Sequence, residues 1–269
     1  MDHRPIGVFD SGLGGLTAVA EIQKILPSEN IIYFGDTSRV PYGGRSKEVL
    51  LKYARQDMAF LRSFDIKAVL VACGTVSTNA LPELAAENAL PMLGVVEPSC
   101  RRAVEATRNK KVGMIATAAS VRSGCYEKTI TALDGDVKVT SLACPLFVPL
   151  VENGRYRPED NVVRLVAEEY LAPMQEAGVD TLILGCTHYP LLTEVIKAVM
   201  GDGVTLINAG AEAAQELKTV LRAQNMLSDA RSGTTTLYAS DISGDFETLA
   251  GRFLRREVHG VQCVDIDKY

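Results

Sequence analysis

Short apolar runs alternate with longer amphipathic stretches along this chain. The runs are rich in Val, Ile and Leu, which is typical of buried strands in a parallel sheet. The stretches between them are long enough for helices, and this alternation indicates β-α units. The pattern predicts strands at Ile6–Phe9, Ile31–Phe34, Ala68–Ala72, Met92–Val96, Val112–Ala116, Val137–Leu142, Thr181–Leu184, Val204–Ile207 and Thr235–Tyr238.

Two amphipathic stretches give the clearest helix predictions. Apolar residues recur at helical spacing from Leu50 to Leu61 and would bury one face of a helix that begins near Lys47. A later run, from Val162 to Tyr170, has the same spacing. Because proline lacks an amide hydrogen, we expect Pro173 to bend or end that second helix.

Two pairs of segments look like internal copies of each other. Residues 67–75 and 180–187 each read as a strand that ends in Cys and Thr before a helix. Residues 6–11 and 112–117 each read as a strand that ends in a small or polar turn. The sequence therefore predicts an α/β fold of two similar domains with mainly parallel sheets. Since ligands of such sheets bind beyond the carboxyl ends of the strands, we expect the active site in the cleft between the domains.

Composition limits the partners and the compartment. With 47% hydrophobic and 23% charged residues, the 269-residue chain is expected to be an ordered globular protein. A net charge of −5 without clustered Lys and Arg argues against nucleic acid as a partner. No segment has the length and apolarity of a membrane span, and the first apolar run comes too early for a signal peptide. The six cysteines form no Cys-x-x-Cys pair, so we expect reduced thiols in a cytoplasmic protein.

Cys73 and Cys186 are the strongest candidates for chemistry. Each stands at a predicted strand end before polar residues, where we expect a partly exposed thiol near a helix N-terminus. That position lowers a cysteine pKa from about 8.5 toward neutrality. His188 follows Cys186 by two residues and could exchange protons with it, and Asp10 could serve Cys73 in the same way.

The same cysteines leave other functions open. Cys73, Cys186 and His188 would also suit a catalytic zinc of the two-cysteine, one-histidine kind. A zinc-dependent hydrolase or lyase is therefore the second hypothesis. A non-catalytic amino-acid-binding or regulatory protein, in which Gly74 marks a decayed site, is the third.

Two turns that contain glycine could bind an anion. Residues 10–15, Asp-Ser-Gly-Leu-Gly-Gly, follow a strand and open a helix, where free N–H groups favour a carboxylate or phosphate. The spacing is not that of a dinucleotide site, because Thr17 stands where the third glycine belongs. The alternative is that these glycines only permit a tight turn and close helix packing. A weaker signal is Tyr42-Gly43-Gly44, in the polar loop from Thr37 to Ser46.

Read together, these segments resemble the glutamate racemase family over nearly the whole chain. The resemblance rests on four stretches that occur in order, residues 6–17, 33–43, 144–152 and 184–192. Thr187-His188 after the second cysteine is similar to the glutamate branch rather than to aspartate and hydantoin racemases. The resemblance implies racemisation of L- and D-glutamate in the cytoplasm without a cofactor or a metal, and a supply of D-glutamate for bacterial peptidoglycan.

The resemblance also implies a role for each site residue. Cys73 and Cys186 would be the paired acid and base on opposite faces of the substrate α-carbon, with Cys73 acting on D-glutamate and Cys186 on L-glutamate. Asp10 would assist Cys73, while Glu152 and His188 would assist Cys186. The implied substrate-binding positions, by side chain or backbone, are Asp10, Ser11, Tyr42, Gly43, Gly74, Thr75, Thr187 and His188.

One position departs from the family pattern. The usual Cys-Asn-Thr reads Cys-Gly-Thr at residues 73–75, so an amide contact to the substrate is missing or replaced. Thr75 or the N–H of Gly74 could compensate, and Asn79 is a more distant candidate. The resemblance further implies a second domain of residues 98–207, with residues 1–97 and 208–269 forming the first. We expect a homodimer.

Overall fold

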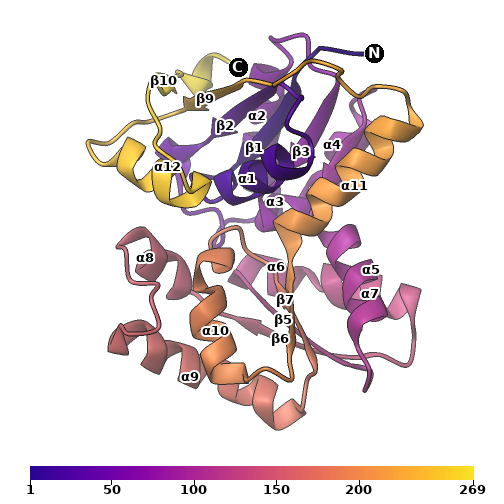
Figure 1. Ribbon diagram of the computed structural model, residues 1–269, viewed down its shortest axis with the longest axis vertical. Helices are drawn as coiled ribbons and strands as arrows, with labels where there is room; N and C mark the ends of the chain where they lie inside the picture. The colour runs from indigo at the N-terminus through magenta and orange to yellow at the C-terminus, as the bar shows by residue number, and fades with distance from the viewer.

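Two parallel sheets organise the chain. The computed structural model describes all residues, Met1–Tyr269, and Figure 1 shows one sheet in the upper body and the other in the lower body. The first sheet has the order β10-β9-β2-β1-β3-β4 and the second the order β6-β5-β7-β8. Every pair of neighbouring strands is parallel, as the alternating pattern predicted. The elements around the first sheet are the first domain, and those around the second sheet are the second domain.

The predicted strands are all present. The first sheet contains β1 Ile6–Asp10, β2 Ile31–Gly35, β3 Ala68–Val71, β4 Met92–Gly94, β9 Thr235–Ala239 and β10 Gln262–Cys263. The second contains β5 Lys111–Ala116, β6 Lys138–Ala143, β7 Thr181–Leu184 and β8 Thr205–Asn208. Strand β4 ends at Gly94, and Val96 already begins a helix. Pro98 fits the first turn of that helix, where a missing N–H costs no hydrogen bond. Strand β10 was missed because two residues carry no pattern.

Helices cover both sheets. Around the first sheet lie α1 Leu16–Ile25, α2 Lys47–Leu61, α3 Gly74–Asn79, α4 Leu81–Ala86, α11 Ala209–Ala223 and α12 Phe246–Leu254. Around the second lie α5 Val96–Ala106, α6 Ala118–Ser123, α7 Cys125–Leu133, α8 Phe147–Glu152, α9 Asn161–Ala177 and α10 Thr193–Met200. Three short 3-10 helices are η1 Thr37–Arg39, η2 Tyr189–Leu192 and η3 Ile266–Lys268. No helix is both long and apolar enough to cross a bilayer.

The two helix predictions meet different outcomes. Helix α2 begins at Lys47, as predicted, and the Ser46 side chain caps it by accepting a hydrogen bond from the N–H of Val49. Helix α9 does not end at Pro173 but continues to Ala177. Burial of one face of α9, up to Met174, stabilises the helix beyond the hydrogen bond that proline removes.

The two sheets share one strand order, which explains the internal repeat. The order β2-β1-β3-β4 in the first sheet matches β6-β5-β7-β8 in the second, so β1 corresponds to β5 and β3 to β7. These are the strands of the two repeated segment pairs. Cys73 after β3 and Cys186 after β7 therefore occupy equivalent places, and so do the turns after β1 and β5.

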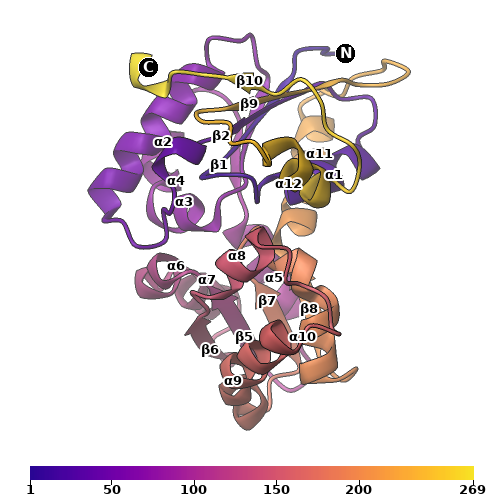
Figure 2. The ribbon, with the colours of Figure 1, turned by 90° about the vertical axis from the view of Figure 1, so that its left-hand side faces the viewer.

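The chain crosses between the domains twice, at neighbouring places. It passes through Val95, between β4 and α5, and again between β8 and α11. Helices α5 and α11 pack against each other there (Figure 1). Arg101 of α5 forms an ion pair with Glu216 of α11 at 2.7 Å. The predicted domain boundaries, at residues 97 and 208, lie next to these crossings. Figure 2 shows α6 and α8 at the end of the second domain that faces the first.

Candidate active site

Cys73 and Cys186 lie at the boundary between the domains and are both buried. Cys73 is separated from the end of β3 by Ala72 and is the N-cap of α3. Cys186 is separated from the end of β7 by Gly185. Their exposed fractions are 3% and 8%, so the prediction of partly exposed thiols was wrong. The reason is tertiary packing, within the first domain at Cys73 and from the approach of the two domains, since a β-carbon at Gly74 would lie 2.4 Å from the carbonyl oxygen of Gly185.

Cys73 lies in a dry pocket beside carboxyl and hydroxyl groups. Its Sγ donates a hydrogen bond to Oγ of Ser11 at 3.6 Å. Burial, followed by the nearby Asp10 carboxyl, raises the pKa of Cys73 to about 12. The predicted lowering toward neutrality was therefore wrong for Cys73. Helix α3 has six residues, and the stabilisation that its N-terminus gives a thiolate is smaller than the cost of removing that thiolate from water.

Asp10 is held by the glycine turn that follows it. Its Oδ2 accepts hydrogen bonds from the N–H groups of Gly15 at 2.8 Å and Gly12 at 3.3 Å. A β-carbon at Gly15 would lie 2.5 Å from Cβ of Asp10, so glycine is needed for this approach. The N–H groups predicted to bind an external anion therefore bind a carboxylate of the chain itself.

The other oxygen of Asp10 makes no such contact. Asp10 is 1% exposed, and its Oδ1 has no hydrogen-bond partner in the chain. Burial raises the pKa of Asp10, although the charge of His188 and the turn N–H groups oppose that shift. Oδ1 is consequently a buried acceptor left without a partner.

Cys186 belongs to a chain of three proton-handling groups. Its Sγ lies 4.0 Å from Nδ1 of His188, and Nε2 of that ring lies 3.0 Å from Oε1 of Glu152, the last residue of α8. Phe253 of α12 packs edge-on against the imidazole, with ring centroids 5.0 Å apart. Burial lowers the pKa of His188, but its contacts with Cys186 and Glu152 outweigh burial and raise it to about 10. His188 is thus a buried imidazolium at neutral pH.

Tyr42 does not present its side chain to the cleft. The buried phenol donates a hydrogen bond to Oδ2 of Asp36 and another, at 3.4 Å, to Oδ2 of Asp57. Arg39 pairs with both carboxylates, at 2.5 and 3.0 Å. This network holds the loop and keeps the Tyr42 side chain inside the first domain. Tyr42 and Gly43 therefore offer a substrate their backbone groups only. The Gly43 carbonyl accepts a hydrogen bond at 3.1 Å from the N–H of a second-domain residue in α6.

The predicted threonines take part in contacts between the domains. Oγ1 of Thr75 lies 2.9 Å from Oγ1 of Thr117, and the hydroxyl of Thr17 donates to the carbonyl of Thr187 at 2.9 Å. Thr17 and Thr117 were missed as candidate site residues. Thr117 directly follows β5 and is the N-cap of α6. The internal repeat pairs it with the turn after β1, so the repeat held the signal.

Asn79 does not replace the amide that is absent at position 74. Its Nδ2 donates to the carbonyl of Thr75 and to Oγ1 of Thr78, both at 2.9 Å. The side chain is therefore turned back onto its own helix. The backbone N–H of Gly74 and the hydroxyl of Thr75 are left as the polar groups nearest to Cys73 in sequence.

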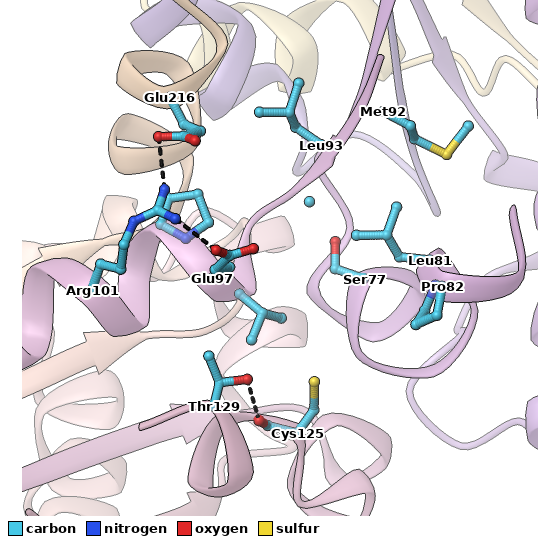
Figure 3. A pocket seen from close by; sticks show the side chains of 13 residues that line it. Ser77, Leu81, Pro82, Met92, Leu93, Glu97, Arg101, Cys125, Thr129 and Glu216 are labelled. Atoms are coloured by element: carbon cyan, nitrogen blue, oxygen red, sulfur yellow. Dashed lines mark hydrogen bonds and ion pairs between the residues drawn. The ribbon is translucent and has the colours of Figure 1, made fainter. Parts of the chain in front are cut away.

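Cys73 and Cys186 belong neither to a cluster of metal ligands nor to the lining of a cavity of about 350 Å³. No three His, Cys, Asp or Glu side chains gather where they could hold a metal ion, so the zinc hypothesis finds no ligand set. A cavity of about 350 Å³ lies behind α3, between β4, α5 and α7 (Figure 3). Its lining includes Arg101, held between Glu97 and Glu216, but neither Cys73 nor Cys186.

Comparison with known proteins places the chain among amino-acid racemases. The family described as Asp/Glu/Hydantoin racemase matches residues 19–217. A glutamate racemase from Geobacter metallireducens is 43% identical over 268 residues, covering 99% of this chain and 98% of that one.

Solved structures agree in fold over the full length. The glutamate racemase isoform RacE1 from Bacillus anthracis has a TM-score of 0.93 and 40% identity, with 98% of each chain covered. The glutamate racemase from Francisella tularensis, solved in complex with D-glutamate, has a TM-score of 0.93 and 36% identity, with 100% of each chain covered. This chain belongs to the Asp/Glu/hydantoin racemase family.

Proposed function

We propose that this chain interconverts L-glutamate and D-glutamate without a cofactor, using Cys73 and Cys186 as paired acid and base. One observation carries the proposal: each domain contributes one buried thiol, and each thiol has its own proton-handling partner. Asp10 stands beside Cys73, and His188 with Glu152 stands beside Cys186. The D-glutamate complex of the Francisella tularensis relative supports the choice of substrate.

The proposed reaction moves one proton off the α-carbon and another onto it. A thiolate on one face removes the α-proton, and the electron pair of the broken C–H bond moves into the substrate carboxylate. The thiol on the opposite face then gives its proton to the α-carbon and becomes a thiolate. The configuration is inverted, and the two cysteines have exchanged roles.

The two halves of the site differ in the groups that surround each thiol. With its pKa raised to about 12, Cys73 is a thiol at neutral pH and is ready to act as the acid. The His188 imidazolium can stabilise a thiolate on Cys186, which acts on L-glutamate in this scheme. For the reverse direction, Oδ1 of Asp10 can accept the Cys73 proton or a hydrogen bond from the substrate ammonium group.

Burial of both thiols makes a thiolate a stronger base toward the weakly acidic α-proton of the substrate. Water is kept from the cysteines, so a thiolate there is not weakened by hydration. Gly74 and Thr75 at the start of α3 and Thr187 beside Cys186 are the proposed contacts to the substrate, and Ser11 and Gly43 complete the set on the first domain. Donors fixed in this way stabilise the negative charge that develops on the carboxylate.

Isotope exchange tests the proposal directly. The protein is incubated with L-glutamate in heavy water, while polarimetry follows optical rotation and NMR follows deuterium at the α-carbon. We expect the rotation to disappear as deuterium enters. Cys73→Ser and Cys186→Ser should each lower the racemisation rate by about 10²- to 10⁴-fold, the usual contribution of a positioned acid or base.

The exposed Cys263 provides the control, because Cys263→Ser should leave the rate unchanged. Wild-type protein that neither exchanges the α-proton nor loses rotation would refute the function. Near-normal activity in either site variant would refute the two-cysteine mechanism.

The proposed product is D-glutamate for peptidoglycan, made in the cytoplasm by a homodimer. Expression of the gene in a bacterium that requires added D-glutamate tests the supply, since the strain should then grow without D-glutamate. Light scattering of the purified protein tests the assembly, and a monomeric mass would contradict it.

A further inference from the structure

Two glycines of the first domain lie where the second domain comes closest. A β-carbon at Gly14 would lie 2.2 Å from Oγ1 of Thr187, and one at Gly74 would lie 2.4 Å from the carbonyl oxygen of Gly185. The obstacles at Gly14 are side-chain atoms, Oγ1 of Thr187 and two ring atoms of His188 at 2.5 and 2.6 Å. The obstacle at Gly74 is backbone at the end of β7, which can move only with its domain.

We propose that Gly74 sets how far the two domains close over the site. Ordinary van der Waals contact begins near 3.4 Å, so in this chain a β-carbon at position 74 would hold the Gly185 carbonyl about 1 Å farther away. The same reasoning predicts a wider cleft at this point in relatives that carry the family's usual asparagine. The inference rests on the proposed racemase function, since the closed cleft is where the two thiols act.

The contact controls the spacing of the cysteines through the chain itself. Gly74 directly follows Cys73, and Gly185 directly precedes Cys186. Separating the two glycines therefore separates the two thiols. Both proton transfers depend on that separation, because one substrate α-carbon has to be within reach of a sulfur on each face.

The position of the contact makes a small displacement effective. A cavity of about 10 Å³ adjoins it and is lined by Gly74, Gly185, Val95 and Ala209. Val95 and Ala209 mark the two places where the chain crosses between the domains. Because the glycine contact lies beside this natural pivot, points farther from the crossings would separate by more than the glycines do.

A displacement of this size would break hydrogen bonds between the domains. The Thr75–Thr117 hydroxyl pair is 2.9 Å apart, and the N–H of Ala119 lies 3.1 Å from the Gly43 carbonyl. An added 1 Å would take both beyond hydrogen-bond distance. A side chain at position 74 would thus open the cleft and admit water, and would not merely adjust one contact.

Gly74→Ala tests this role, because the substitution favours formation of α3 but should hinder closure of the two domains. Gly74 begins α3, and alanine is the better helix former, so α3 should form in the variant and far-UV circular dichroism should match the wild type. We nevertheless expect kcat to fall by about 10²-fold, the scale of loss from a 1 Å misplacement. The control is Gly203→Ala, at an exposed glycine whose β-carbon would meet nothing within 4 Å.

Alkylation reports on closure without relying on activity. Iodoacetamide labelling is mapped by mass spectrometry at Cys186, which is 8% exposed, and at Cys144, which is buried in the same domain. In Gly74→Ala we expect Cys186 to react several-fold faster than in the wild type, although the substitution is in the other domain. Cys144 should react as slowly as before.

Each outcome decides between the alternatives. Unchanged kcat and unchanged Cys186 labelling in Gly74→Ala would overturn the inference while leaving the racemase intact. Faster labelling of Cys144 as well would also count against it, because Gly74 would then serve folding and not closure. A wild type without racemase activity would refute the proposed function, and the labelling rates would still test whether Gly74 controls closure.

Discussion

Replacing His188 with glutamine should change how the stability of the protein depends on pH. In the folded chain the contacts of His188 with Cys186 and Glu152 overcome burial and raise its pKa from the usual 6.5 to about 10. Below about pH 6.5 the histidine is protonated in both the folded and the unfolded chain. Between about 6.5 and 10 only the folded chain keeps the proton, so its contribution to stability is complete below this window and is lost across it.

The magnitude follows from the number of protons involved. One extra proton in the folded state lowers the free energy of unfolding by about 1.4 kcal/mol for each unit of rising pH. The wild type should therefore lose stability more steeply than His188→Gln between about pH 7 and pH 9. Other groups that titrate equally in both proteins cancel from the difference between the two curves.

Urea unfolding followed by circular dichroism at pH 7, 8 and 9 measures these slopes. The exposed His259 offers a matched control, and His259→Gln should follow the wild-type curve. Glu152→Gln should reduce the wild-type slope only in part, because the Glu152 side chain is 45% exposed and its charge is screened by water. Parallel curves for the wild type and His188→Gln would mean that His188 is neutral in the folded protein, and the imidazolium assigned to the Cys186 half would be wrong.

Two further predictions concern buried charges away from the cysteines. Lys67 and Glu29 form an ion pair at 2.5 Å with almost no exposure, so Lys67→Met should lower the free energy of unfolding by about 3–5 kcal/mol, because it leaves a buried carboxylate unpaired. Urea unfolding measures the loss, the exposed Lys24→Met should show little change, and a similarly small effect at Lys67 would contradict the argument. Tyr42→Phe removes a donor to the buried Asp57 carboxyl and should cost about 1–3 kcal/mol while raising KM more than it lowers kcat. Unaltered stability and KM would show that the phenol does not hold its loop.

Much of the fold could be read from local pattern. The apolar runs predicted every strand of both sheets except β10, and the helical spacing predicted the helix that begins at Lys47. The repeat of a strand ending in Cys and Thr predicted equivalent positions for Cys73 and Cys186. These features depend on neighbours in sequence, so the sequence expresses them directly. Pro173 was expected to bend or end its helix, and it does not end it, because burial of a whole face stabilises the turn that a single residue weakens.

The site depended on distances that no local pattern contains. The sequence alone determined which side chains follow the strands, and so supplied two thiols with acid and base groups near them. Tertiary structure decided that both thiols are buried, that the pKa of Cys73 rises instead of falling, and that Tyr42 turns its phenol away from the cleft. It also brought Gly74 against Gly185. The physical reason is that desolvation and close approach depend on packing between residues far apart in the chain. That packing lies within one domain at Tyr42 and between the two domains at Gly74.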